Sequence, residues 1–154
     1  MKKLIRFSWI NSLIGVILSS VLLSFSTSPG AHNFQVYLDN KLMIDQYVNL
    51  KMNAPTLLVD PADNYSQLIV KYNECGRKVT GRKITVKDDQ NKVLKDWAFE
   101  GASSGYEDAM TCKLKDVVAL KQKGNNTLKI FYSSKEFPEG QQLANLVISA
   151  DAET

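Results

Sequence analysis

The feature of this sequence that most constrains its fold is a set of short stretches in which every second residue is apolar. Phe34, Val36 and Leu38 alternate in this way, and the same period recurs from Leu68 to Tyr72 and from Leu128 to Tyr132. A period of two places these side chains on one face of a β-strand, whereas a helix needs a period of about 3.6. The sequence therefore predicts an all-β protein.

Eight or nine stretches have the character of strands, and polar turns separate them at spacings of roughly 8–14 residues. They cover residues 34–38, 42–48, 57–59, 67–72, 83–87, 92–99, 110–114, 127–132 and 143–150. Residues 116–121 do not alternate, and we expect a single helical turn or a crossing between sheets there.

Two stretches carry finer information about which side chains face the core. In 92–99, Leu94 has the opposite parity to Val93 and Trp97, so we expect a β-bulge near Lys95-Asp96 that changes the facing. In 42–48 the parity of Leu42, Ile44 and Val48 predicts that these three face inward.

Regularly spaced strands with little helix are typical of a two-sheet sandwich or a small barrel. We favour a two-sheet antiparallel β-sandwich of about eight strands, and its strand pattern resembles that of immunoglobulin-like sandwiches. The sequence contains no internal repeat or linker, so residues 31–154 are expected to form one domain.

Residues 1–30 have the three parts of a secretory signal peptide. Lys2, Lys3 and Arg6 precede an apolar segment at 10–25, and small residues follow it. This segment is shorter than the ~20 residues that a membrane-spanning helix needs, so we expect cleavage, after Ser26 or after Gly30, rather than a retained anchor. The mature protein is then exported to the periplasm or the cell exterior, and only the uncleaved signal contacts the membrane.

Removing this segment changes the charge balance of the chain. Three of its 19 Lys and Arg residues lie in the signal, and the remaining 16 equal the 16 Asp and Glu residues. A nucleic-acid-binding domain normally carries a positive excess, so we expect no nucleic-acid partner.

The chain has two cysteines, Cys75 and Cys112. An exported domain with two cysteines allows one intramolecular disulfide, and closing a loop of this length contributes about 3–4 kcal/mol on the chain-entropy model. We therefore expect a structural Cys75–Cys112 bond, with a reactive thiol pair as the alternative.

Residues that commonly carry catalysis are scarce. The one histidine, His32, lies at the signal boundary, where we expect a flexible leader that cannot complete a catalytic triad. Glu107 and Asp108 leave open a small hydrolase that uses loop carboxylates. Asp60, Asp63 and Asn64 form a weak candidate calcium site, although turn formation explains them equally well. We expect no cofactor and no enzymatic activity.

Two loops offer groups suited to binding a protein or a carbohydrate. Tyr65 lies beside Asn64 in loop 60–65, and Tyr106 lies beside Glu107 in loop 100–111. Loops at the end of a rigid sandwich often form recognition surfaces. A basic turn with Arg77, Lys78, Arg82 and Lys83 is a candidate anion-binding patch.

These observations favour an exported, non-enzymatic β-sandwich that binds a ligand or a protein partner. The alternative is a structural component of an envelope complex that assembles through its sheet edges. A small hydrolase is the third hypothesis.

Overall fold

The structure is a computed structural model that describes residues 32–48, 53–105 and 107–149. The chain divides into two units, Met1–Gly30 and Ala31–Thr154, and the following description concerns the second. The predicted signal peptide lies outside the described residues. The described residues are mostly β, with little helix, and the prediction of an all-β protein is confirmed.

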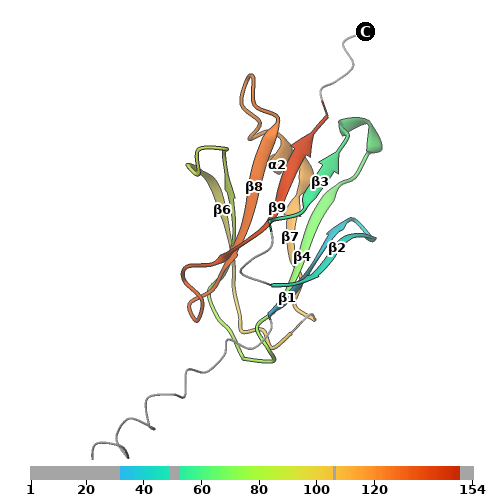
Figure 1. Cartoon of the computed structure of the whole chain (residues 1–154). Helices are drawn as coiled ribbons and strands as arrows, with labels where there is room; N and C mark the ends of the chain where they lie inside the picture. Colours follow the sequence, from blue (N-terminus) through green and yellow to red (C-terminus); the bar gives the residue numbers. More distant parts are fainter. Residues whose placement is uncertain (1–31, 49–52, 106, 150–154) are drawn as a thin grey trace, which may run out of the picture. The chain divides into compact units, whose positions relative to one another are not determined.

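Within the described residues, nine strands form two sheets (Figure 1). The four-stranded sheet has the order β2-β1-β4-β7, with β1 Asn33–Leu38, β2 Lys41–Tyr47, β4 Gln67–Asn73 and β7 Met110–Lys113. The five-stranded sheet has the order β3-β9-β8-β5-β6, with β3 Thr56–Val59, β5 Arg82–Lys87, β6 Val93–Phe99, β8 Thr127–Ser133 and β9 Gln141–Ile148. A 3-10 turn, η1 (Pro61–Asp63), precedes β4, and a short helix, α2 (Leu114–Val118), follows β7.

The inward-facing rows predicted from the alternation are buried, and they form one cluster between the two sheets. Phe34, Val36 and Leu38 come from the four-stranded sheet, and Leu128 and Ile130 come from the five-stranded sheet. The two sheets therefore share a single core in a sandwich-like arrangement. Removing a buried side chain of this size, as in Leu→Ala, typically costs 2–5 kcal/mol.

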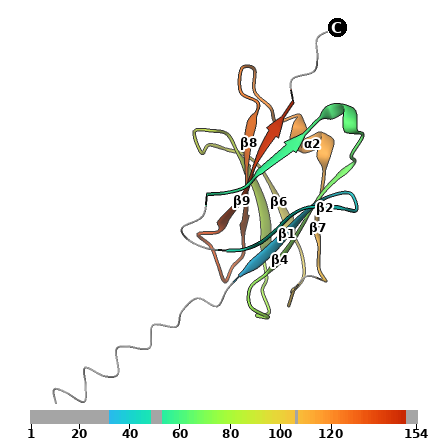
Figure 2. The same cartoon turned by 45° about the vertical axis from the view of Figure 1, so that its right-hand side comes forward.

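Helix α2 carries the chain from the four-stranded sheet toward the five-stranded sheet. Its apolar residues Leu114 and Val117 are buried, while Lys115 is exposed. The predicted helical turn is thus present, although it begins two residues earlier than expected. In Figures 1 and 2, α2 and the loop before β4 lie at the same end of the domain.

The strand irregularities are β-bulges. Val86 pairs with Lys95 and Lys87 pairs with Val93, so Leu94 is the extra residue, one position from the predicted bulge. A second bulge lies in β2, because Val36 pairs with Ile44 and Tyr37 with Leu42. This bulge turns Leu42 outward, where it is 46% exposed, and the prediction that Leu42 faces inward was wrong.

The expectation of a wholly antiparallel sandwich was also wrong at one pair. β3 runs parallel to β9, with Leu57 opposite Leu146 and Val59 opposite Ile148. Alternation shows which residues face the core, but it carries no information about the direction of the neighbouring strand. The parallel pair therefore could not be read from the sequence.

The structure does not form the predicted Cys75–Cys112 disulfide, and both thiols are free. Cys112 pairs with Leu68 in the sheet, and Cys75 follows the far end of β4. The strand from Leu68 to Asn73 alone spans ~16 Å at ~3.3 Å per residue. The Cα atoms of a disulfide lie within ~7 Å of each other. Sequence separation alone could not reveal this distance.

Candidate binding surfaces

The structure separates the two loops that were predicted to form one recognition surface. Tyr65 lies before the start of β4, next to the end of β7, because Gln67 pairs with Lys113. Glu107 precedes β7 and therefore lies toward the opposite end of these antiparallel strands. Tyr106 lies outside the described residues. Tyr65 and Asn64 thus remain together, whereas Glu107 belongs to a different surface.

The basic turn does not form a single patch. Arg77 and Lys78 are exposed, but Arg82 is 5% exposed, and its Nη1 donates a hydrogen bond of 2.6 Å to the backbone carbonyl of Asp108. Lys83 points outward from β5 toward Asp96 on β6. The buried guanidinium fastens the backbone at Asp108, just before β7, to the sandwich, which is a structural role.

Asp60 and Asn64, from the candidate calcium site, have structural roles at the two ends of η1. The Asp60 carboxylate accepts a hydrogen bond of 2.9 Å from the N–H of Ala62 and so caps η1. Asn64 ends this turn in the left-handed conformation, with φ 53°. Within the described part of the chain, no group of three or more His, Cys, Asp or Glu side chains could hold a metal ion.

Tyr65 lies at the centre of the first candidate surface, which we call the Tyr65 depression. It is a hollow of about 410 Å³ lined by Tyr65, Ser66, Gln67, Lys113 and Lys115. A neighbouring hollow of about 180 Å³ shares Tyr65 and Lys115, and its other lining residues are Asp60 and the apolar Val59, Pro61, Leu114 and Val118. The Lys41 ammonium lies 3.3 Å from the Tyr65 hydroxyl and donates to it. An aromatic ring, apolar walls and three lysines therefore meet at this end of the sandwich.

The lysines of the Tyr65 depression have no acidic partners in the described part of the chain. There the ion pairs are Lys83–Asp96 and Lys95–Asp116, and neither involves this depression. The nearby Asp39 carboxylate instead accepts hydrogen bonds from the N–H groups of Ser66 and Gln67, at 3.1 and 2.8 Å. Asp39 thus holds the backbone, and Lys41, Lys113 and Lys115 form no ion pair with an acidic side chain of the described residues.

A second surface lies on the outer face of the five-stranded sheet, and we call it the Phe131 depression. It has a volume of about 230 Å³, and its lining includes outward side chains of three strands and the turn before β9. The register places Asp96, Thr85 and Phe131 in one row across β6, β5 and β8. Because a rigid sheet holds all three, their relative positions are fixed by strand pairing.

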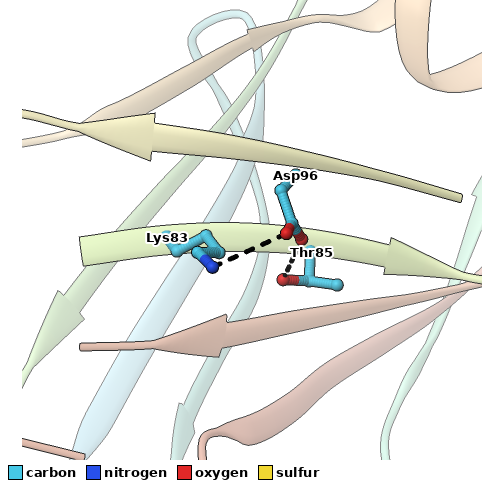
Figure 3. Close-up of polar contacts among 3 residues, drawn as sticks. All are labelled: Lys83, Thr85 and Asp96. Atoms are coloured by element: carbon cyan, nitrogen blue, oxygen red, sulfur yellow. Dashed lines mark hydrogen bonds and ion pairs between the residues drawn. The ribbon is translucent and has the colours of Figure 1, made fainter. Parts of the chain in front are cut away.

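Polar contacts hold the side chains of this row, Asp96, Thr85 and Phe131, in place. Figure 3 shows the Asp96 carboxylate directed toward Thr85 and Lys83 on the neighbouring strand. The Thr85 hydroxyl donates to it at 2.6 Å, and the Lys83 ammonium lies 3.5 Å away. The Lys87 ammonium lies 4.2 Å from the centre of the Phe131 ring, in a cation–π contact. In contrast to the Tyr65 depression, a carboxylate here faces one of the lysines.

A buried polar cluster at the end of β4 was missed from the sequence. Glu74 is 3% exposed and accepts hydrogen bonds from the hydroxyls of Tyr132 and Ser134, at 2.8 and 2.7 Å. The Tyr132 ring stacks on Tyr72 with 3.9 Å between ring centres. Extending the alternation of β4 by one step, from Tyr72 to Glu74, would have predicted this inward carboxylate.

His32 belongs to the same cluster, and the expectation of a flexible leader at this residue was wrong. Its Nδ1 lies 3.1 Å from the Tyr72 hydroxyl, and its ring packs edge-on against Tyr72 and Phe137. Its carbonyl accepts a hydrogen bond of 2.7 Å from the N–H of Val48. His32 has the parity of Phe34, so it continues the inward row of β1 and closes that end of the core.

Comparisons with known protein families and with curated protein sequences found no match. Among the described residues, no helix is long and apolar enough to cross a membrane.

Proposed function

We propose that this protein is an exported, non-enzymatic binding module that holds an acidic partner in the Tyr65 depression, in the periplasm or outside the cell. The observation that carries this proposal is the group of three exposed lysines without acidic partners around Tyr65. Lysines that form no ion pair beside a concave surface can attract anionic groups and raise their local concentration.

The backbone around Tyr65 is held rigidly, which supports a binding role for this end of the sandwich. Asp39 fixes the backbone at Ser66 and Gln67, and the N–H of Leu114 donates a hydrogen bond of 2.8 Å to the carbonyl of Ser66. These contacts hold the Tyr65 loop against α2 before any partner arrives. A preorganised surface loses less conformational entropy on binding.

Export follows from the signal-like residues 1–30, whose removal leaves a domain of balanced charge. In such a domain a local group of lysines is not part of a general positive surface. Recognition of an acidic partner would therefore be confined to the Tyr65 depression.

We also infer that the sandwich is immunoglobulin-like. In support, five strands have the order β3-β9-β8-β5-β6, with the first strand parallel to the last strand of the chain, and β1, β4 and β7 lie in the other sheet. The antiparallel pairs β8–β9 and β5–β8 form the centre of the five-stranded sheet. The same arrangement is found in the immunoglobulin sheet to which variable-type domains add extra strands. The Cys75–Cys112 bond is not part of this inference.

Assembly through sheet edges receives less support. The long edge strands β2 and β6 each contain or oppose a bulge, and the inward-facing Lys95 of β6 pairs with Asp116 at 4.0 Å. Bulges and inward charges are features that protect an edge strand from pairing with another chain.

The test compares binding of dextran sulfate with binding of uncharged dextran, by calorimetry, for residues 31–154. We expect the wild type to bind dextran sulfate, and the double variant Lys113→Ala with Lys115→Ala to bind about tenfold more weakly. The matched control is Lys78→Ala with Lys92→Ala, which removes two exposed lysines away from the depression.

Equal losses in the two double variants would show that general surface charge, rather than the depression, holds the polymer. Equal binding of both polymers by the wild type would also refute the proposal. Raising the salt concentration to about 0.5 M should weaken the wild-type interaction, because exposed charges are screened within a few ångströms under these conditions.

A further inference from the structure

We propose that the Phe131 depression is a second binding site, which takes one face of a neutral carbohydrate. This inference goes beyond the proposed function, because it concerns the other sheet and a ligand of different charge. It is carried by three observations on the outer face of the five-stranded sheet: an aromatic ring, a balanced set of charged groups and a wall formed by a tight turn.

The ring of Phe131 is the apolar element of the site. It points outward from the centre of β8, between Thr85 on β5 and Gln142 on β9. Val93 and Pro138 add apolar surface to the same hollow. A sugar ring has an apolar face of C–H groups and a rim of hydroxyls, so it fits an aromatic surface that polar groups surround.

The charged groups around Phe131 select against an ionic ligand. Lys83 and Lys87 supply two positive charges, and Asp96 and Glu139 supply two negative charges. A polyanion would meet the two carboxylates, and a cation would meet the two ammonium groups. A neutral ligand with many hydroxyls can donate to the carboxylates and accept from the lysines.

The turn before β9 forms a wall beside β8. Gly140 has φ +69°, and a Cβ atom at this position would lie 2.4 Å from the carbonyl oxygen of Tyr132. Only glycine allows this close approach, which brings Pro138 and Glu139 to the edge of the hollow. The site is therefore built from residues distant in sequence that the fold holds together.

Lys87 covers the Phe131 ring in the free protein, at 4.2 Å from its centre. The lysine side chain has four rotatable bonds, and its ammonium group is solvated, so it can move aside while remaining at the rim. The ligand then stacks on the ring, and the displaced ammonium donates a hydrogen bond to a ligand hydroxyl.

The experiment screens the folded domain, residues 31–154, against an array of neutral and acidic oligosaccharides. We expect binding to at least one neutral oligosaccharide, unchanged at 0.5 M NaCl. Phe131→Ala should weaken it about tenfold or more. The matched control is Tyr37→Ala, because Tyr37 is an outward aromatic residue of the other sheet with Lys71 5.2 Å from its ring centre.

A conservative variant, Asp96→Asn, tests the polar rim without changing its size, and it should weaken neutral-sugar binding several-fold. Failure of the wild type to bind any neutral oligosaccharide would overturn the proposal. So would binding that is retained in Phe131→Ala or lost equally in Tyr37→Ala. Lys113→Ala with Lys115→Ala should leave neutral-sugar binding intact, so failure of the proposed function would be seen separately.

Discussion

The two depressions of this protein both contain lysines and an aromatic ring, yet they differ in where their carboxylates are engaged. On the sheet face, strand pairing places Asp96 opposite Thr85 and within 3.5 Å of Lys83. At the Tyr65 end, Asp39 and Asp60 accept hydrogen bonds from backbone N–H groups of turns. Carboxylates at the Tyr65 end thus hold the local backbone, and the lysines beside them form no ion pair among the described residues.

The largest expected effect comes from reversing charge in one depression at a time. Lys113→Glu with Lys115→Glu should reduce dextran sulfate binding about 100-fold, because attraction becomes repulsion at close range. Lys83→Glu with Lys87→Glu, on the sheet face, should leave that binding unchanged. Calorimetric titration of both double variants measures the difference, and a similar loss in both would erase the distinction between the two surfaces.

Thiol labelling provides the structural control for these variants. Burial raises the pKa of the Cys112 thiol to about 12, and Cys112 directly precedes Lys113 in β7. In the folded protein, iodoacetamide at pH 8 should therefore label the exposed Cys75 and not Cys112. Mass mapping under non-reducing conditions would also detect a disulfide. Rapid labelling of Cys112 in the Lys113 variant would mean that β7 has been disturbed.

Raising the pH should destabilise the fold, and with it both depressions, because one core supports both of them. Burial, and then the charge or hydrogen bond of Glu74, raises the pKa of Tyr72 and Tyr132 above the ordinary value, and burial raises that of Cys112. The folded state therefore keeps protons that the unfolded chain releases. Stability should be fully present below pH ~9 and fall as the pH rises from there toward 12.

Each such group lowers the free energy of unfolding by up to about 1.4 kcal/mol per pH unit within this window. Urea denaturation at pH 8, 9, 10 and 11 measures the slope. Cys112→Ala should reduce the slope between pH 9 and 10, where the unfolded tyrosines are still largely protonated. A flat stability profile up to pH 11 would contradict the burial of these groups.

Local sequence patterns predict which side chains face the core, but not which distant residues become neighbours. Alternation identified the inward rows through Phe34, Leu68 and Leu128 because side-chain facing in a strand is a local property. It identified Tyr65 as a loop residue, but not its neighbours Lys113 and Lys115, which are distant in sequence. Their proximity depends on the pairing of β4 with β7, and no local pattern encodes that pairing.

The same limit applies to the cysteines and explains the error at His32. Cys75 and Cys112 were joined on the basis of composition, whereas the register of β4 with β7 separates them. His32 was assigned to a flexible leader because of its position in the chain, whereas its contacts come from Tyr72 and Phe137. In each case the deciding quantity was a long-range contact.

The smallest expected effect comes from removing the one carboxylate that pairs with a lysine of the Phe131 depression. Asp96→Asn leaves Lys83 unpaired and gives this face a net positive charge, as at Tyr65. Because both side chains are about two-fifths exposed, the loss of stability should be below ~1 kcal/mol in thermal unfolding. Weak new binding of dextran sulfate should accompany it, abolished again by Lys83→Ala. If Asp96→Asn gains no affinity for the polyanion, unpaired lysines alone do not make an anionic site, and the geometry around Tyr65 must contribute as much as its charge.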